Sequence, residues 1–225
     1  MTQLRQPCPV PQVRNASISE EGNGSFGVWL PSDCPFGSLQ LKQAKIMLRV
    51  DEANRRIASA FGQWQRLAGA MSLKAHSRHT LELESAVFLL QRAADEFVSV
   101  HAVLAHLEAH GGYPDRVGID GVAALLRHGL FLSAAPYRDH QEILRTLNDI
   151  GNAHKHTFID ATPAAAGDRE PVIFALALRR SGLSFGPKFF HVPLRTLVED
   201  FDGFYQDCLA WLQAWSERHL RKAAA

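Results

Sequence analysis

Cysteine is scarce in this sequence. The 225 residues contain three cysteines, Cys8, Cys34 and Cys208, which are widely spaced and form no CxxC pair. An odd and sparse set of cysteines is typical of proteins from reducing compartments. We therefore expect a cytoplasmic location.

Long apolar runs are missing as well. The strongest run is the seven residues from Val172 to Leu178, whereas a membrane-spanning helix needs about 18–20 apolar residues. Residues 1–15 contain no apolar stretch of the kind that a secretory signal carries behind its basic residues. The sequence therefore predicts no membrane partner.

Motifs for nucleotide binding and for nucleophilic hydrolysis are also absent. The sequence contains no GxxxxGK[ST], no GxGxxG and no GxSxG, the patterns that build phosphate-binding loops and hydrolase nucleophiles. The formal net charge is +1, from 24 basic and 23 acidic residues. The molecule as a whole thus has no strong electrostatic preference for nucleic acid, and we expect no cofactor.

Proline and glycine interrupt the first 37 residues, which include Pro7, Pro9, Pro11, Pro31 and Pro35. Such punctuation prevents a long regular element. We predict an irregular N-terminal arm at 1–37, a helical-bundle domain at 38–220 and a short tail at 221–225.

From residue 38 onward, apolar residues recur in steps of three and four, which is the spacing of one buried helix face. We predict four long helices, at about residues 38–72, 80–110, 139–158 and 194–220. Thr80 is a candidate N-cap of the second helix. A short helix is expected near 120–130, and apolar alternation predicts a β-hairpin at about 171–192. The predicted fold class is mainly α: an up-and-down helical bundle of four long helices with one short helix and a β-hairpin insertion.

The last helix carries the clearest apolar pattern. Leu194, Phe201, Cys208 and Trp215 are seven residues apart, and further large apolar residues accompany them. Few charges flank this stripe, as is typical of a core helix in a bundle and unlike a solvent-exposed coiled coil. We expect it to be buried against the first two long helices.

A polar stripe runs along the predicted helix at 139–158. Arg145, Asp149, Asn152 and His156 follow one another in steps of four, three and four. On a helix this spacing puts them on one face, offset from the apolar face. They are the candidate catalytic residues.

The end of this stripe resembles the HEPN superfamily of small helical bundles. Members carry an arginine, a polar residue directly after it and a histidine five positions beyond the arginine. Asn152 and His156 match this motif, and Lys155 precedes the histidine as in many relatives. The resemblance implies a metal-independent ribonuclease site, commonly built across a homodimer interface.

The position of the motif arginine is Gly151. In the implied reaction a 2′-hydroxyl attacks the neighbouring phosphate, histidine acts as general acid or base, and arginine stabilises the developing charge. Arg145 is a candidate substitute, about 9 Å away along the helix axis. Because arginine has a higher helix propensity than glycine, we expect an arginine to be tolerated at residue 151.

Two other interpretations of these polar residues remain open. Lys155 and His156 suit a helix C-terminus, so the stripe can be a solvated face without function. His101, His106 and His110 on the second helix suggest a metal or small-molecule site, although their spacing differs from the HExxH of zinc proteases.

Charge is distributed unevenly along the first two helices. Residues 38–79 contain eight Lys or Arg against two Asp or Glu, whereas residues 80–120 contain seven acidic residues against two arginines. The preferred interpretation is ion pairing along the seam between adjacent antiparallel helices. The alternative is a phosphate-binding face.

The sequence therefore predicts a HEPN-like homodimer with a degenerate ribonuclease motif, which binds RNA or a protein partner. The first alternative is an active RNA endonuclease that uses His156 and Asn152, with Arg145 or another cation in place of the missing arginine. The second is a metal or small-molecule site on the histidines of the second helix.

Overall fold

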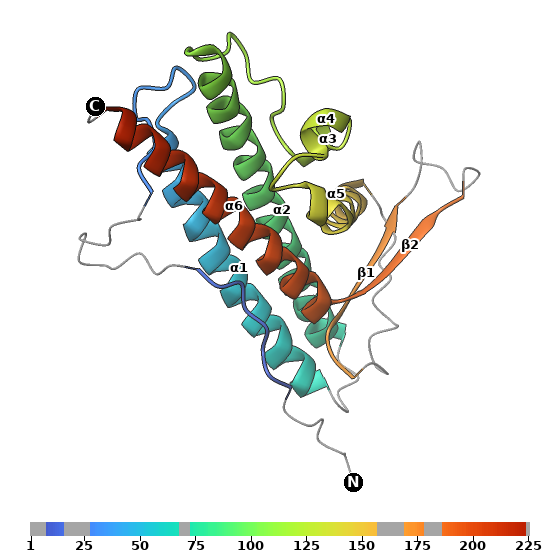
Figure 1. The fold of residues 1–225 in the computed structure, drawn as a ribbon. Coiled ribbons are helices and arrows are strands. Elements are labelled where there is room, and N and C mark those ends of the chain that lie inside the picture. The colour runs from blue at the N-terminus through green and yellow to red at the C-terminus, as the bar shows by residue number, and fades with distance from the viewer. Residues whose placement is uncertain (1–7, 16–27, 68–72, 157–168, 178–185, 224–225) are drawn as a thin grey trace, which may run out of the picture.

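The computed structural model describes residues 8–15, 28–67, 73–156, 169–177 and 186–223. Two long antiparallel helices, α1 (Leu39–Leu67) and α2 (Leu73–His110), pack along their length. The C-terminal helix α6 (Leu194–Ala223) lies over both, and α5 (Gln141–His156) packs on α2 and α6 (Figure 1). The predicted mainly helical bundle is confirmed.

The second helix begins seven residues earlier than predicted, at Leu73. Thr80 is not an N-cap, because its hydroxyl donates a 3.2 Å hydrogen bond to the carbonyl oxygen of His76, one turn back within the helix. His79 is buried, and its Nδ1 lies 3.1 Å from the carbonyl oxygen of Ala60 on α1. The mostly polar first turns of α2, residues 74–79, therefore extend the packing of α2 on α1.

The predicted short helix is two short helices, α3 (Val122–Leu125) and α4 (Gly129–Leu132). Between them the backbone tightens into i to i+3 hydrogen bonds, such as the 2.8 Å bond from His128 N–H to the Leu125 carbonyl oxygen. A 3-10 turn, η1 (Arg138–His140), then leads directly into α5.

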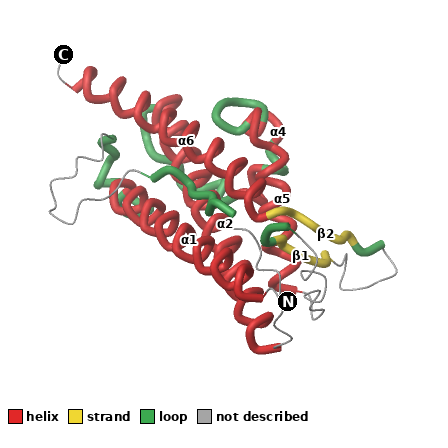
Figure 2. Tube along the Cα trace, turned by 90° about the horizontal axis from the view of Figure 1, so that it is seen from below, coloured by secondary structure: helices red, strands yellow, loops and turns green. Residues whose placement is uncertain are grey.

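The predicted β-hairpin is confirmed. Strands β1 (Val172–Ala177) and β2 (Lys188–Pro193) pair antiparallel, with Val172 opposite Pro193 and Ala177 opposite Lys188. The expected turn at Ser181-Gly182 lies outside the described residues. The hairpin stands beside α5 at one edge of the bundle (Figures 1 and 2).

The apolar stripe of α6 is buried, as predicted. Leu194 and Phe201 are fully buried, and Cys208 and Trp215 are nearly so. They belong to one hydrophobic core that includes residues of α1, α2 and α5. This shared core holds the helices together.

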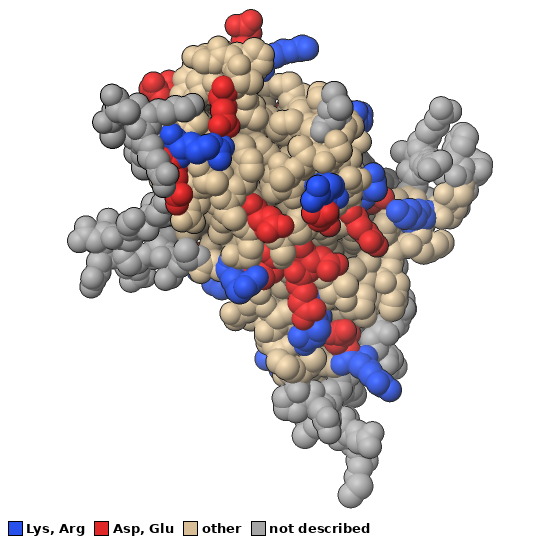
Figure 3. All heavy atoms as spheres, in the orientation of Figure 1, with Lys and Arg blue, Asp and Glu red and all other residues tan. Residues whose placement is uncertain are grey.

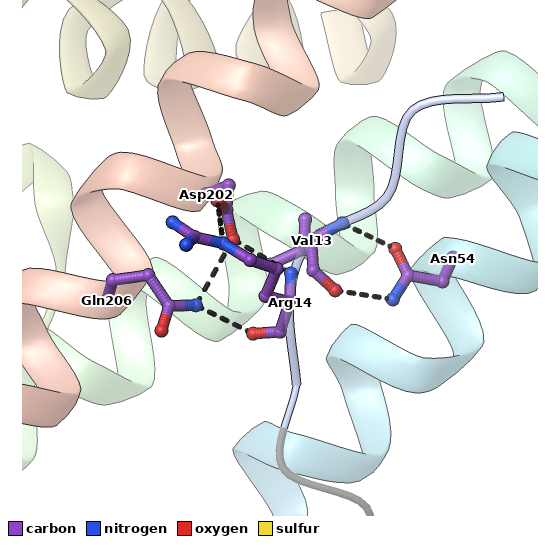
Figure 4. A network of polar contacts seen from close by, with 5 residues as sticks. All are labelled: Val13, Arg14, Asn54, Asp202 and Gln206. Atoms are coloured by element: carbon purple, nitrogen blue, oxygen red, sulfur yellow. Dashed lines mark hydrogen bonds and ion pairs between the residues drawn. The ribbon is translucent and has the colours of Figure 1, made fainter. Parts of the chain in front are cut away.

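Residues 8–15 of the N-terminal arm lie along the seam between α1 and α6 (Figure 4). The side-chain amide of Asn54 forms two hydrogen bonds with the backbone of Val13. It accepts a 2.9 Å bond from the Val13 N–H and donates a 2.9 Å bond to the Val13 carbonyl oxygen. On the other side, Asp202 accepts bonds from the backbone and the side chain of Arg14 at 2.8 and 2.7 Å. The arm therefore ties α1 to α6.

Among the described helices, none combines the length and the apolar content that would let it span a bilayer. The α6 helix runs to Ala223, three residues into the segment that we expected to be a tail.

The buried α6 stripe makes a testable prediction about stability. The Phe201 side chain of α6 is fully buried in the hydrophobic core. We expect Phe201→Ala to lower the free energy of unfolding by about 3–5 kcal/mol, because removing a large buried ring leaves a cavity. Urea unfolding of both proteins would measure this, and a loss below about 1 kcal/mol would contradict the assignment of this stripe to the core.

Candidate functional site

The structure places the predicted polar stripe on one face of α5. Arg145 and Asn152 are exposed, and Asp149 is half-buried. The Arg145 guanidinium donates a 3.1 Å hydrogen bond to Gln141, one turn earlier in the same helix. Asp149 forms a 3.0 Å ion pair with Lys188 of β2. His156 is the last residue of α5, and its side chain lies outside the described part of the structure.

Gly151 faces α2 and is buried. A Cβ atom added at this position would overlap with Oε1 of Gln91 and lie only 2.6 Å from its Cδ. These atoms are the end of the Gln91 side chain. An arginine at residue 151 would therefore require the end of the Gln91 side chain to shift, a cost that the prediction from helix propensity did not include.

Gln91 occupies the space that a motif arginine at residue 151 would need. Its side chain is only 5% exposed. Its Oε1 is buried and accepts no hydrogen bond from any described residue. Burial of an unpaired polar oxygen lowers the stability of the fold.

Next to Gly151 an open cleft separates α2 from α5, with a volume of about 240 Å³. Its wall on α2 consists of Glu84, Ser85 and Phe88, and its wall on α5 consists of Gly151, His154 and Lys155. The Phe88 ring is 51% exposed, and the Lys155 ammonium lies 5.8 Å from its centroid. This distance is within the range of a cation–π interaction.

Phe88 was not among the residues predicted for the site. It lies off the buried stripe of α2, seven residues after Leu81, which is also exposed. A spacing of seven puts two residues on the same helix face. Two large apolar side chains on the polar face of a helix are a signal that the sequence contains and that we did not use.

The cleft carries charges of both signs. Lys155 lies near Asp95, which is one turn beyond Gln91 on α2, and burial raises the pKa of Asp95. The N–H of Val122 donates a 2.8 Å hydrogen bond to Asp95, and this bond together with the charges of Arg92 and Lys155 opposes the rise in pKa. Asp95 therefore anchors α3 to α2 beside the cleft.

His101 is a core residue. Its Nδ1 lies 2.8 Å from the Tyr137 hydroxyl, and its ring centroid lies 3.7 Å from that of Trp211. Burial lowers the pKa of His101 to about 3, so the ring is neutral at physiological pH. Aromatic side chains, those of Tyr137 and Trp211 among them, surround the His101 ring.

His106 and His110 pair with each other at the end of α2. Their ring centroids are 4.2 Å apart, and His110 Nδ1 lies 3.1 Å from the His106 carbonyl oxygen. Within the described ranges, no group of three or more His, Cys, Asp or Glu side chains is placed to hold a metal ion. The described residues thus give no support to the metal interpretation of these histidines.

The α2–α5 cleft is the arrangement with the clearest chemical capability. An exposed ring can stack on a planar group, and the adjacent ammonium can attract an anion. Among the described motif residues, the Asn152 amide lies on the exposed face of α5, one residue after Gly151. The cleft therefore offers a ring face and one ammonium to a planar ligand, beside the carboxylate of Glu84.

We found no match to this chain among protein-family models, curated proteins or solved structures.

The contact between Gly151 and Gln91 can be tested by substitution. Helix propensity alone would make Gly151→Ala stabilising by about 1 kcal/mol. Because the new Cβ would collide with Gln91, we expect it to destabilise the fold by about 1–3 kcal/mol. Urea unfolding would measure the difference.

The control for this experiment is the same substitution in a Gln91→Ala background, where the colliding atoms are absent. There, Gly151→Ala should be neutral or stabilising. Equal effects of Gly151→Ala in both backgrounds would show that the two side chains do not compete for this space.

The buried histidine predicts a pH dependence. The pKa of His101 is lowered from 6.5 to about 3, so below pH 6.5 the unfolded chain binds a proton that the folded chain excludes. Stability is therefore fully present above the unfolded pKa and decreases as the pH falls. Between pH 7.5 and pH 5 we expect a loss of about 2 kcal/mol from this residue. Unfolding curves should show this loss in the parent chain and lack it in His101→Gln, whereas parallel pH profiles would contradict a buried neutral ring.

Proposed function

We propose that this chain binds single-stranded RNA without cleaving it, as a helical bundle of the HEPN type that lacks the motif arginine. The observation that carries the proposal is the α2–α5 cleft, where the exposed Phe88 ring and the Lys155 ammonium lie beside the motif residue Gly151. Proteins that bind single strands combine aromatic rings, on which bases stack, with cations that contact the phosphates.

The proposal that RNA is not cleaved is supported by the glycine at residue 151. The motif arginine would stabilise the negative charge that develops on the phosphate. Gln91 fills the space next to residue 151, and Arg145 is turned toward Gln141 on an earlier turn of α5. The described residues around the cleft therefore supply a cation for binding, in Lys155, but no arginine at the motif position.

The face of the molecule formed by α1 and α6 is a poorer candidate for RNA. On the face that Figure 3 shows, acidic and basic side chains are interspersed over α1 and α6. Arg14 of the arm pairs with Asp202 of α6, and Arg56 pairs with Glu52 on α1. Cations that are already paired with carboxylates contribute little to phosphate binding.

The test measures the binding of a fluorescent single-stranded RNA to the full chain at low salt. We expect Phe88→Ala to weaken binding by about 1–3 kcal/mol, because one stacked base is lost. Lys155→Gln should reduce the slope of log affinity against log salt by about 0.7, the value for one phosphate contact on a single strand.

Two matched controls lie on α1, away from the cleft. Leu48 is as exposed as Phe88, and Lys45 is an exposed lysine, so neither Leu48→Ala nor Lys45→Gln should change affinity. If the parent chain does not bind RNA at low salt, the proposal is wrong. Metal-free cleavage that Asn152→Ala abolishes would overturn the non-cleaving part of it.

A further inference from the structure

Three cations surround one hollow at the end of the α1–α2 hairpin. Arg66 lies in the last turn of α1, and Lys74 and Arg78 lie in the first two turns of α2. All three side chains are exposed. Together with Gln63 and two small or apolar side chains they line a hollow of about 350 Å³.

These three cations differ from Arg49 and Arg56 of α1, which form ion pairs. Arg49 pairs with Glu96 of α2 at 3.0 Å, and Arg56 pairs with Glu52 and Glu82 at 2.8 and 3.3 Å. No described carboxylate lies within ion-pair distance of the cations that line the hollow, namely Arg66, Lys74 and Arg78. Like charges held around one hollow repel one another, and this repulsion favours an anion in their midst.

Gln63 of α1 also lines this hollow. Its Nε2 donates to the Ser59 hydroxyl at 3.2 Å, and its Oε1 is buried without a described partner.

We propose that Arg66, Lys74 and Arg78 form a binding site for a phosphate group. A guanidinium binds two phosphate oxygens at once, and an ammonium binds as a compact point charge. The ligand is therefore a phosphomonoester or phosphodiester, either free or as part of a nucleic-acid strand.

A second hollow connects this site to the α2–α5 cleft. It is lined by Arg56, Gln63, Arg78, Leu81, Glu82 and Ser85. It shares Gln63 and Arg78 with the phosphate site and Ser85 with the cleft. From Lys74 to Phe88 the path along α2 is about 21 Å long. We infer that one RNA strand could place a phosphate in this site and a base on Phe88, and this part of the inference rests on the proposed function.

The experiment titrates the full chain with two probes, pyrophosphate and a single-stranded RNA, over a range of salt. We expect Arg66→Gln and Arg78→Gln each to weaken pyrophosphate binding about tenfold, because a charge-assisted hydrogen bond is lost. Each should also lower the salt slope of RNA binding by about 0.7.

Arg55→Gln is the matched control, because Arg55 is an exposed arginine of α1 that is already paired with Glu52. It should change neither titration. All these side chains are on the surface, so thermal melting should show that the variants fold like the parent.

The outcomes separate this site from the proposed function. If pyrophosphate binds through Arg66 and Arg78 but RNA does not bind at all, the phosphate site stands and the proposed function falls. If RNA binding responds to Phe88→Ala but neither probe responds to Arg66→Gln or Arg78→Gln, the phosphate site is wrong. If the control weakens both probes equally, binding is general to the basic surface and the site is likewise wrong.

Discussion

The missing side chain at Gly151 determines how α5 lies against α2. With no Cβ there, the backbone of α5 comes close enough for the buried Gln91 side chain to fill the contact. The position of α5 in turn places Lys155 beside Phe88. It also fixes the hairpin, through the ion pair between Asp149 and Lys188 and the 3.4 Å contact of His154 Nε2 with the carbonyl oxygen of Phe174.

Much of the fold could be predicted because the apolar residues that become buried recur at regular spacings in the sequence. The seven-residue spacing from Leu194 to Trp215 predicted a core helix, and those residues are buried. The start of α2 could not be predicted in this way, since the residues before Thr80 are mostly polar. They pack on α1 through the contact between His79 Nδ1 and the Ala60 carbonyl oxygen. The docking of the arm by Asn54 and Asp202 likewise depends on single hydrogen bonds, which leave no periodic trace.

The charge pattern of the first two helices allowed two interpretations, and ion pairing along the seam describes the middle of the helix pair. In the middle of the seam, Arg49 pairs with Glu96, as complementary charge on antiparallel helices predicts. At the end of the α1–α2 hairpin, no described carboxylate pairs with Arg66 or Arg78, and both side chains line a hollow. Net charge over forty residues cannot distinguish the two, because it does not say where along the helix each charge finds a partner.

The polar stripe of α5 could be predicted from its spacing, but the direction of Gly151 could not. A helix position next to Asn152 can face solvent or the neighbouring helix, and only the packing of α5 on α2 determines which. Because residue 151 faces inward, an arginine there would have to displace the end of the Gln91 side chain. The proposed absence of cleavage thus rests on the glycine at this position, and the proposed binding rests on the cleft that lies beside it between α2 and α5.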